Sequence, residues 1–244
     1  MATDTLIILG DSYSDFYYGD KIKWSDDKKS YVSWPRMLDK THPIKNISKK
    51  GVGPQWVVNQ FQNFFNEKTG KRLRKHGDVK LLIFMPDMRR WNLSFIEDDY
   101  QAATADFVYS GNSKSIPSRQ HEWLHKYVRY YVAHENNFAL DELKYYTFFK
   151  AYSHFFKKIC IIPTTPLQTN LSHLNDNKFE ITKFNMDEIQ KKDHPDPNAK
   201  LDYRINHLTE KNHHVMLHKV VAFIEEGTIP NINGFNFGKF SEDK

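Results

Sequence analysis

Short apolar runs alternate with longer segments of helical period along this chain. The runs at residues 6–9 (LIIL), 79–85 (VKLLIFM) and 159–162 (ICII) are continuous and brief, which is typical of strands buried on both faces of a sheet. The second and third runs end at a proline, a residue that interrupts a strand ladder. A shorter extended segment is expected at 43–47. These runs predict the strands of a mainly parallel sheet.

Helices are expected between the strands. Residues 33–40 begin with Ser33 near the cap and Pro35 in the first turn, residues 55–65 are amphipathic, and residues 119–158 and 208–226 have a helical period. One apolar helix face carries aromatic side chains, which we interpret as core rather than as a ligand cage: Phe148, Phe149, Tyr152, Phe155 and Phe156. Strands alternating with helices predict a three-layer α/β/α sandwich.

The same pattern predicts the domain organisation. One domain is expected over residues 1–226, because a chain of 244 residues is long enough for one core. The polar, irregular residues 97–118 are interpreted as an insertion, and the charged, proline-bearing residues 178–200 as mostly loop. The Gly- and Asn-rich residues 227–244 are expected to form a loosely held tail.

Composition narrows the class of protein. Hydrophobic residues make up 39% of the chain and aromatic residues 15%, which excludes disorder throughout. The formal charge of +5 comes from 35 basic and 30 acidic residues, a mild excess that does not favour nucleic acid as a partner. The single cysteine, Cys160, stands in an apolar run and is expected to be a buried thiol. No basic leader or membrane-length run is present, so a cytoplasmic protein without a membrane partner is expected.

Polar residues follow three of the predicted strands. Gly10-Asp11-Ser12 follows the first, Asp87 and Arg89 follow the second, and a loop follows Pro163. The carboxyl ends of parallel strands meet at one edge of a sheet, where active sites lie. Ser12 is therefore either a nucleophile, which is expected to be exposed at the end of the first strand, or an ordinary turn residue. A serine nucleophile needs a base, and His207, just before the final helix, is the best placed of the 12 histidines.

Three short sequence blocks, taken in their order along the chain, resemble one known family. An early strand followed by Gly-Asp-Ser, a glycine block at residues 46–53, and a late His-Leu-Thr-x-x-Asn-His resemble the SGNH (GDSL-type) hydrolase family. The segment 202–207, with its D-x-R-x-N-H pattern, resembles phage-encoded members, for which the host cytoplasm would be the location. The resemblance implies a flavodoxin-like sheet of the SGNH hydrolase fold.

The resemblance also implies the site residues. Ser12 would be the nucleophile and His207 the base, while the backbone of Ser12 and Gly51 would form the oxyanion hole, with Gly53 as the next candidate. The family's acid stands three residues before the histidine, where this chain has Arg204; the nearest acid is Asp202, five residues before. The asparagine of the family's third block is also missing, and Asn92 or a neighbouring arginine are the candidates to replace it.

Other polar residues have two interpretations each. Asp11, Arg89 and Arg90 are candidates for substrate contact, although Arg89 and Arg90 could equally form structural ion pairs. His214 and His218 stand four residues apart, but no third ligand accompanies them, so surface histidines are expected and no metal. The group Asp193, His194 and Asp196 is interpreted as a solvated loop.

Together these observations predict an esterase that uses a Ser12-His207-Asp202 triad and no cofactor. The expected substrate is a small-molecule or carbohydrate ester, such as an O-acetyl group on a sugar. The alternative is an SGNH-fold binding module of impaired activity for an anionic partner such as nucleic acid, suggested by the missing asparagine, the displaced acid and the basic balance of the chain. The acyl group, the alcohol and the oligomeric state stay open.

Overall fold

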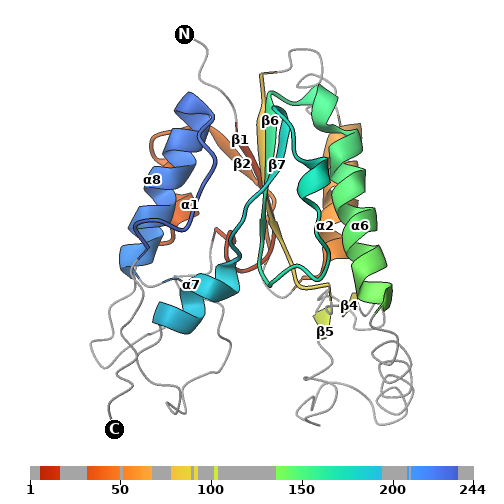
Figure 1. The fold of residues 1–244 in the computed structure, drawn as a ribbon. Helices are drawn as coiled ribbons and strands as arrows, with labels where there is room; N and C mark the ends of the chain where they lie inside the picture. Colours follow the sequence, from red (N-terminus) through yellow and green to blue (C-terminus); the bar gives the residue numbers. More distant parts are fainter. Residues whose placement is uncertain are drawn as a thin grey trace, which may run out of the picture.

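A computed structural model describes residues 6–16, 32–49, 52–67, 78–88, 91–92, 102–103, 136–193, 208 and 210–235. Five parallel strands form its central sheet in the order β2-β1-β3-β6-β7 (Figure 1). Their bounds are β1 (Leu6–Leu9), β2 (Ile44–Asn46), β3 (Lys80–Met85), β6 (Lys158–Pro163) and β7 (Phe179–Ile181). This order is that of a doubly wound, flavodoxin-type sheet. The prediction of a mainly parallel sheet is confirmed.

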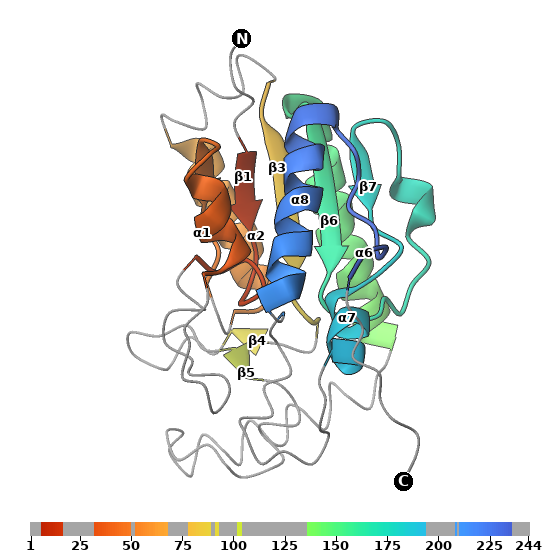
Figure 2. The same ribbon diagram turned by 90° about the vertical axis from the view of Figure 1, so that its left-hand side faces the viewer.

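Helices cover both faces of this sheet (Figures 1 and 2). On one face lie α2 (Pro54–Asn66) and α6 (Asn136–Ala151), and on the other lie α1 (Trp34–Asp39), α7 (Met186–Asp193) and α8 (Glu210–Glu226). Strand residues alternate between the two cores: Ile7 and Leu9 pack toward α2 and α6, whereas Leu6 and Ile8 pack toward α1 and α8. The α/β/α arrangement is therefore confirmed.

The predicted aromatic helix face is core. Phe61 of α2 is fully buried, and its ring centroid lies 5.1–6.0 Å from the centroids of four rings on or after α6: Phe148, Phe149, Tyr152 and Phe156. The first three of these pairs are edge-to-face, an arrangement that adds about 0.5–1.5 kcal/mol each beyond the burial of apolar area. Cys160 is also fully buried, and burial raises the pKa of its thiol far above the usual range.

The prediction that residues 178–200 are mostly loop is wrong over their described part. Residues 179–181 form β7, which pairs with β6, and α7 follows from Met186. Asn185 caps α7, because its Oδ1 accepts the Glu188 N–H at 3.1 Å while its Nδ2 donates to the Glu188 carboxylate at 2.8 Å. A three-residue strand and a polar helix carry too few apolar positions to stand out in the sequence.

The helical segment expected at 119–158 is described from residue 136 onward, and it ends earlier than expected. α6 ends at Ala151, a 3-10 turn (Ser153–Phe155) follows, and β6 begins at Lys158. Of the expected insertion at 97–118, residues 102–103 are described, and they form β5 (Ala102–Ala103), which pairs with β4 (Trp91–Asn92). Residues 227–235, which begin the expected tail, include Phe235, whose ring is 5% exposed and packs against Phe184.

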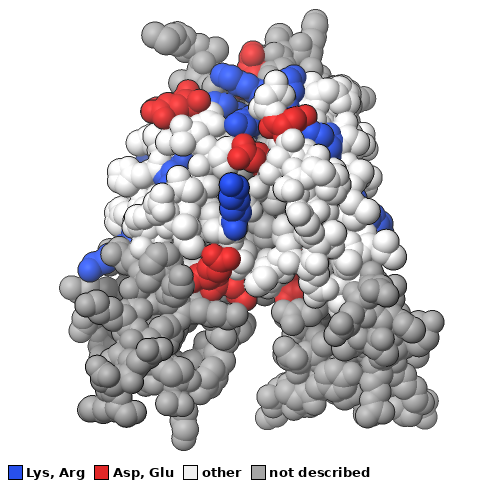
Figure 3. Space-filling view, in the orientation of Figure 1, with Lys and Arg blue, Asp and Glu red and all other residues white. Residues whose placement is uncertain are grey.

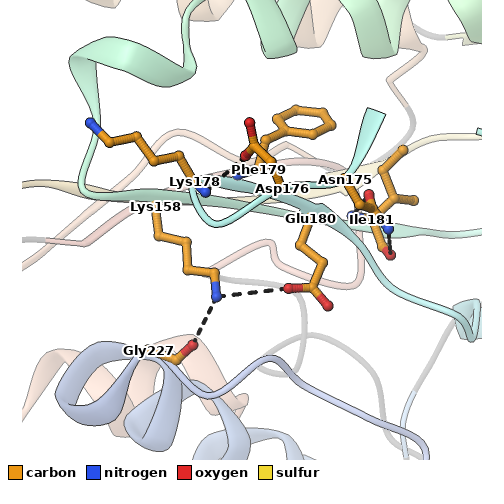
Figure 4. A network of polar contacts seen from close by, with 8 residues as sticks. All are labelled: Lys158, Asn175, Asp176, Lys178, Phe179, Glu180, Ile181 and Gly227. Carbon is orange, nitrogen blue, oxygen red and sulfur yellow. Dashed lines mark hydrogen bonds and ion pairs between the residues drawn. The ribbon is translucent and has the colours of Figure 1, made fainter. Parts of the chain in front are cut away.

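Two lysines hold the end of α8 at the amino edge of the sheet. Lys80 and Lys158 are register partners in β3 and β6. The ammonium of Lys80 donates to the Ile224 carbonyl. The ammonium of Lys158 donates to the Gly227 carbonyl at 3.3 Å and pairs with the Glu180 carboxylate at 3.7 Å (Figure 4). Cations are favourable at the carbonyl end of a helix. Because α8 ends at the amino edge, it begins at the carboxyl edge, near the end of β1.

Candidate active site

A tight turn after β1 carries Ser12 at the carboxyl edge of the sheet. Gly10 makes the turn possible, because a Cβ at that position would lie 2.6 Å from the Ser14 hydroxyl and 2.7 Å from Phe84, at a φ of +154°. The Asp11 carbonyl accepts the Ser14 N–H at 3.1 Å, and the Asp11 carboxylate accepts the Tyr13 N–H at 3.2 Å. Asp11, a candidate for substrate contact, is fully buried and stabilises this turn.

The Ser12 side chain is buried rather than exposed. Only 7% of the residue is accessible, so the expectation of an exposed serine is wrong, although its place at the end of β1 is as expected. Its Oγ has no hydrogen-bond partner among the described residues. A buried hydroxyl without a partner costs free energy, and such groups are rare in folded proteins. A hydrogen-bond partner for this hydroxyl would have to come from a group other than the described residues.

Ser12 also lies at the topological switch point of the sheet. From β1 the chain passes through α1 to β2 on one side, and then through α2 to β3 on the other side of β1. The chain after β1 leads to α1 on one face, and the chain after β3 leads on to α6 on the opposite face, so the connections from the carboxyl ends of β1 and β3 serve opposite faces of the sheet (Figure 1). Doubly wound sheets bind their ligands in the crevice between such connections.

Asn46, at the end of β2, holds the Ser12 turn from one side. Its Nδ2 donates to the Ser14 carbonyl at 2.8 Å, and its Oδ1 accepts the Ser48 N–H at 2.8 Å. The Ser14 hydroxyl donates to the Ser48 hydroxyl at 2.9 Å. Both ends of the Asn46 amide are thus engaged in structure, which does not suit it to replace the missing oxyanion asparagine. Asn followed two residues later by Ser is a local turn signal that could have indicated this role.

A buried carboxylate supports the loop after β6. Glu142 of α6 is 3% exposed and accepts the N–H groups of Gln168 at 3.0 Å and Thr169 at 2.9 Å. Burial raises the pKa of Glu142, and the negative charge of Asp87 acts in the same direction. Glu142 is not among the site residues predicted from the sequence. Its signal was a charge inside an apolar stripe, four residues after Phe138 and four before Tyr146, which are both buried.

Of the other site candidates, Gly53 stands at the cap position of α2 and Asn92 lies in β4, whereas several lie outside the described residues. These are Gly51, Arg89, Arg90, Asp202 and His207, together with His194 and Asp196. Leu208, which follows His207 in the sequence, is 2% exposed and belongs to the core cluster of α1 and α8. His214 and His218 are exposed on α8, as expected of surface histidines. Within the described ranges, no three His, Cys, Asp or Glu side chains gather as metal ligands.

No protein-family model matches the chain, and no curated protein matches its sequence. In the described part of the chain, none of the helices combines the length and apolar character needed to cross a membrane. The central feature of the site is the buried Ser12 hydroxyl, which has no partner among the described residues and lies at the switch point of the sheet.

Proposed function

We propose that this protein is an SGNH-type serine esterase with Ser12 as its nucleophile. The observation that carries the proposal is the Ser12 hydroxyl, which is buried at the carboxyl edge of the sheet with no hydrogen-bond partner among the described residues. The neighbouring serine behaves differently, since the Ser14 hydroxyl is bonded to Ser48. Within the described structure, the Ser14 hydroxyl stabilises the turn, whereas the Ser12 hydroxyl makes no hydrogen bond. This difference favours Ser12 as the reactive serine.

The proposed reaction transfers the acyl group of an ester to water through Ser12. His207 accepts the Ser12 hydroxyl proton as Oγ bonds to the carbonyl carbon, and returns it to the alcohol oxygen as the ester C–O bond breaks. Water then attacks the acyl-enzyme with the same histidine as base. Asp202 orients the imidazole, and the N–H groups of Ser12 and Gly51 stabilise the oxyanion.

The asparagine that supplies the family's third oxyanion donor is missing from the third block of this chain. Removing one such donor typically lowers kcat by about 10²–10³. Asn46 is engaged on both sides of its amide, which leaves Asn92 or a neighbouring arginine as candidates for this donor, and turnover is expected to be slow if neither supplies it. The substrate proposed is a small-molecule or carbohydrate ester such as an O-acetyl sugar, with Arg89 and Arg90 in contact with it.

Labelling by a fluorophosphonate probe tests the proposal. The probe bonds to an activated serine with loss of fluoride, so intact mass and peptide mapping identify the residue. We expect one adduct on Ser12 in the wild-type protein, none in Ser12→Ala, and full labelling of Ser153→Ala, a matched serine variant in the 3-10 turn after α6. An unlabelled wild-type protein, or a labelled Ser12→Ala, would contradict the esterase proposal.

The binding module is the second candidate function, and it requires a basic surface. Figure 3 shows Lys and Arg gathered toward the amino edge of the sheet, where Asp and Glu lie among them. The lysines Lys80 and Lys158 of that edge bond to carbonyls at the end of α8, which reduces what they offer to an anion. Retention on heparin at low salt that falls steeply with added salt is the expected behaviour of such a module.

A further inference from the structure

His213, in the first turns of α8, caps a different helix. The residue is 7% exposed, and its Nδ1 accepts the backbone N–H of Trp34, the first residue of α1, at 3.2 Å. The first N–H groups of a helix have no partner within the helix. Ser33 stands at the cap position but makes no side-chain cap bond, because its hydroxyl donates to the Phe16 carbonyl at 3.1 Å. His213 therefore supplies from α8 the acceptor that the cap residue does not supply.

Trp34 in turn holds the residue that follows Ser12. Its indole Nε1–H donates to the Tyr13 carbonyl at 2.8 Å, and the fully buried indole packs against Phe84 with 5.6 Å between ring centroids. Tyr13 is itself 4% exposed. A continuous set of buried contacts thus runs from the Ser12 turn through Trp34 to His213. α1 and α8, which these contacts join, lie side by side in the core (Figure 2).

The acceptor role requires a neutral imidazole with its proton on Nε2. Burial, assisted by neighbouring His214, lowers the pKa of His213 to about 3. The ring therefore stays neutral in ordinary buffers and keeps Nδ1 available to Trp34.

We propose that His213 is a positioning residue that sets the placement of the Ser12 turn relative to the start of α8. The inference rests on the proposed function, in which His207 is the base. His207 stands three residues before the first residue of α8, so the position of α8 would set the position of the base. Nucleophile and base would then be aligned through Trp34, even though His213 touches neither the substrate nor the reacting atoms. Misplacement of reacting groups by about 1 Å can lower a rate by about 10²-fold.

Three variants test this role. His213→Leu removes the acceptor, His213→Asn restores an oxygen near the place of Nδ1, and Trp34→Phe keeps an aromatic ring but removes the indole donor. We expect His213→Leu and Trp34→Phe to lower kcat for an aryl acetate by about tenfold or more with little change in KM. His213→Asn is expected within about threefold of wild type, a rescue that tests positioning rather than bulk stability. His218→Leu, at an exposed position of the same helix, is the matched control.

Amide and indole hydrogen exchange provides a readout that does not depend on hydrolysis. We expect faster exchange at the Trp34 indole and backbone N–H in His213→Leu, and protection close to wild type in His213→Asn. Unchanged exchange and kcat in His213→Leu, or equal loss in His213→Asn, would overturn the inference. An inactive wild-type protein whose exchange responds to His213→Leu would instead reject the proposed function and leave the contact between α8 and the turn supported. If His213→Leu does not fold, His213→Asn and Trp34→Phe decide the question.

Discussion

The side-chain amide of Asn46 joins the end of β2 to the turn that carries Ser12, since its Nδ2 donates to the Ser14 carbonyl at 2.8 Å. Asn46 and Ser14 are 32 positions apart in the sequence. The parallel ladder continues past β2 on the same side, where the Lys49 N–H donates to the Gly10 carbonyl at 3.1 Å. The backbone on both sides of Ser12 is thus tied to the neighbouring strand.

Removing this amide should loosen the turn. We expect Asn46→Ala to lower the free energy of unfolding by about 1–2 kcal/mol, because it leaves the Ser14 carbonyl and the Ser48 N–H without a partner. Urea unfolding measures the change. Asn59→Ala, on the exposed face of α2, removes an amide that pairs only with Gln55 in the described structure and should cost less than about 0.5 kcal/mol. Equal effects in the two variants would mean that Asn46 does not secure the turn.

Ser12 and Ser14 should respond in opposite ways to replacement by alanine. Ser12→Ala removes a buried hydroxyl with no described partner, so the melting temperature should stay the same or rise while hydrolysis of an aryl acetate is lost. Ser14→Ala breaks the contact with Ser48 and should cost about 1 kcal/mol. Calorimetry with an esterase assay measures both quantities. A clear loss of stability in Ser12→Ala would indicate a structural hydroxyl.

Stability should fall with acid because of His213. Its pKa is about 3 in the folded protein against 6.5 for an unperturbed histidine, so between these values only the unfolded chain binds the proton. Folding stability then decreases as pH falls from 6.5 toward 3, by up to about 1.4 kcal/mol per pH unit from this group. An asparagine in place of this histidine does not titrate, so the stability advantage of the wild-type protein over His213→Asn should shrink with acid. Urea unfolding at about pH 7.5, 5.5 and 4.5, spanning the unfolded-state pKa, measures the difference, and a constant difference would count against a neutral buried imidazole.

Asp202 is the acid that the proposed triad requires. Asp202→Asn should lower turnover by orders of magnitude with little change in melting temperature, because the imidazole of His207 would lose the partner that sets its tautomer. Steady-state kinetics gives the answer. If Asp202 instead pairs with Arg204 at the surface, a contact worth at most about 1 kcal/mol, turnover should stay within a few-fold of wild type. Asp193 and Asp196 would then be the next acids to replace.

Local pattern was sufficient to predict the layers of this fold and the position of Ser12. The apolar runs of β1, β3 and β6 are buried along nearly their whole length, so their hydrophobicity alone identifies them. The aromatic stripe at the end of α6 follows the helical period for the same reason. Gly10 and Ser12 follow β1 directly, so a strand that ends there brings Ser12 to the carboxyl edge.

Tertiary structure alone decided the contacts that define the site. β7 exists because β6 offers a ladder for three residues that have no strong strand signal of their own. Glu142 bonds to the N–H of a residue 26 positions away, and His213 accepts from Trp34, 179 positions away. Buried polar groups must find partners wherever the packed chain supplies them. Such partners are set by the crossing of helices and strands, and no periodicity along the sequence records them.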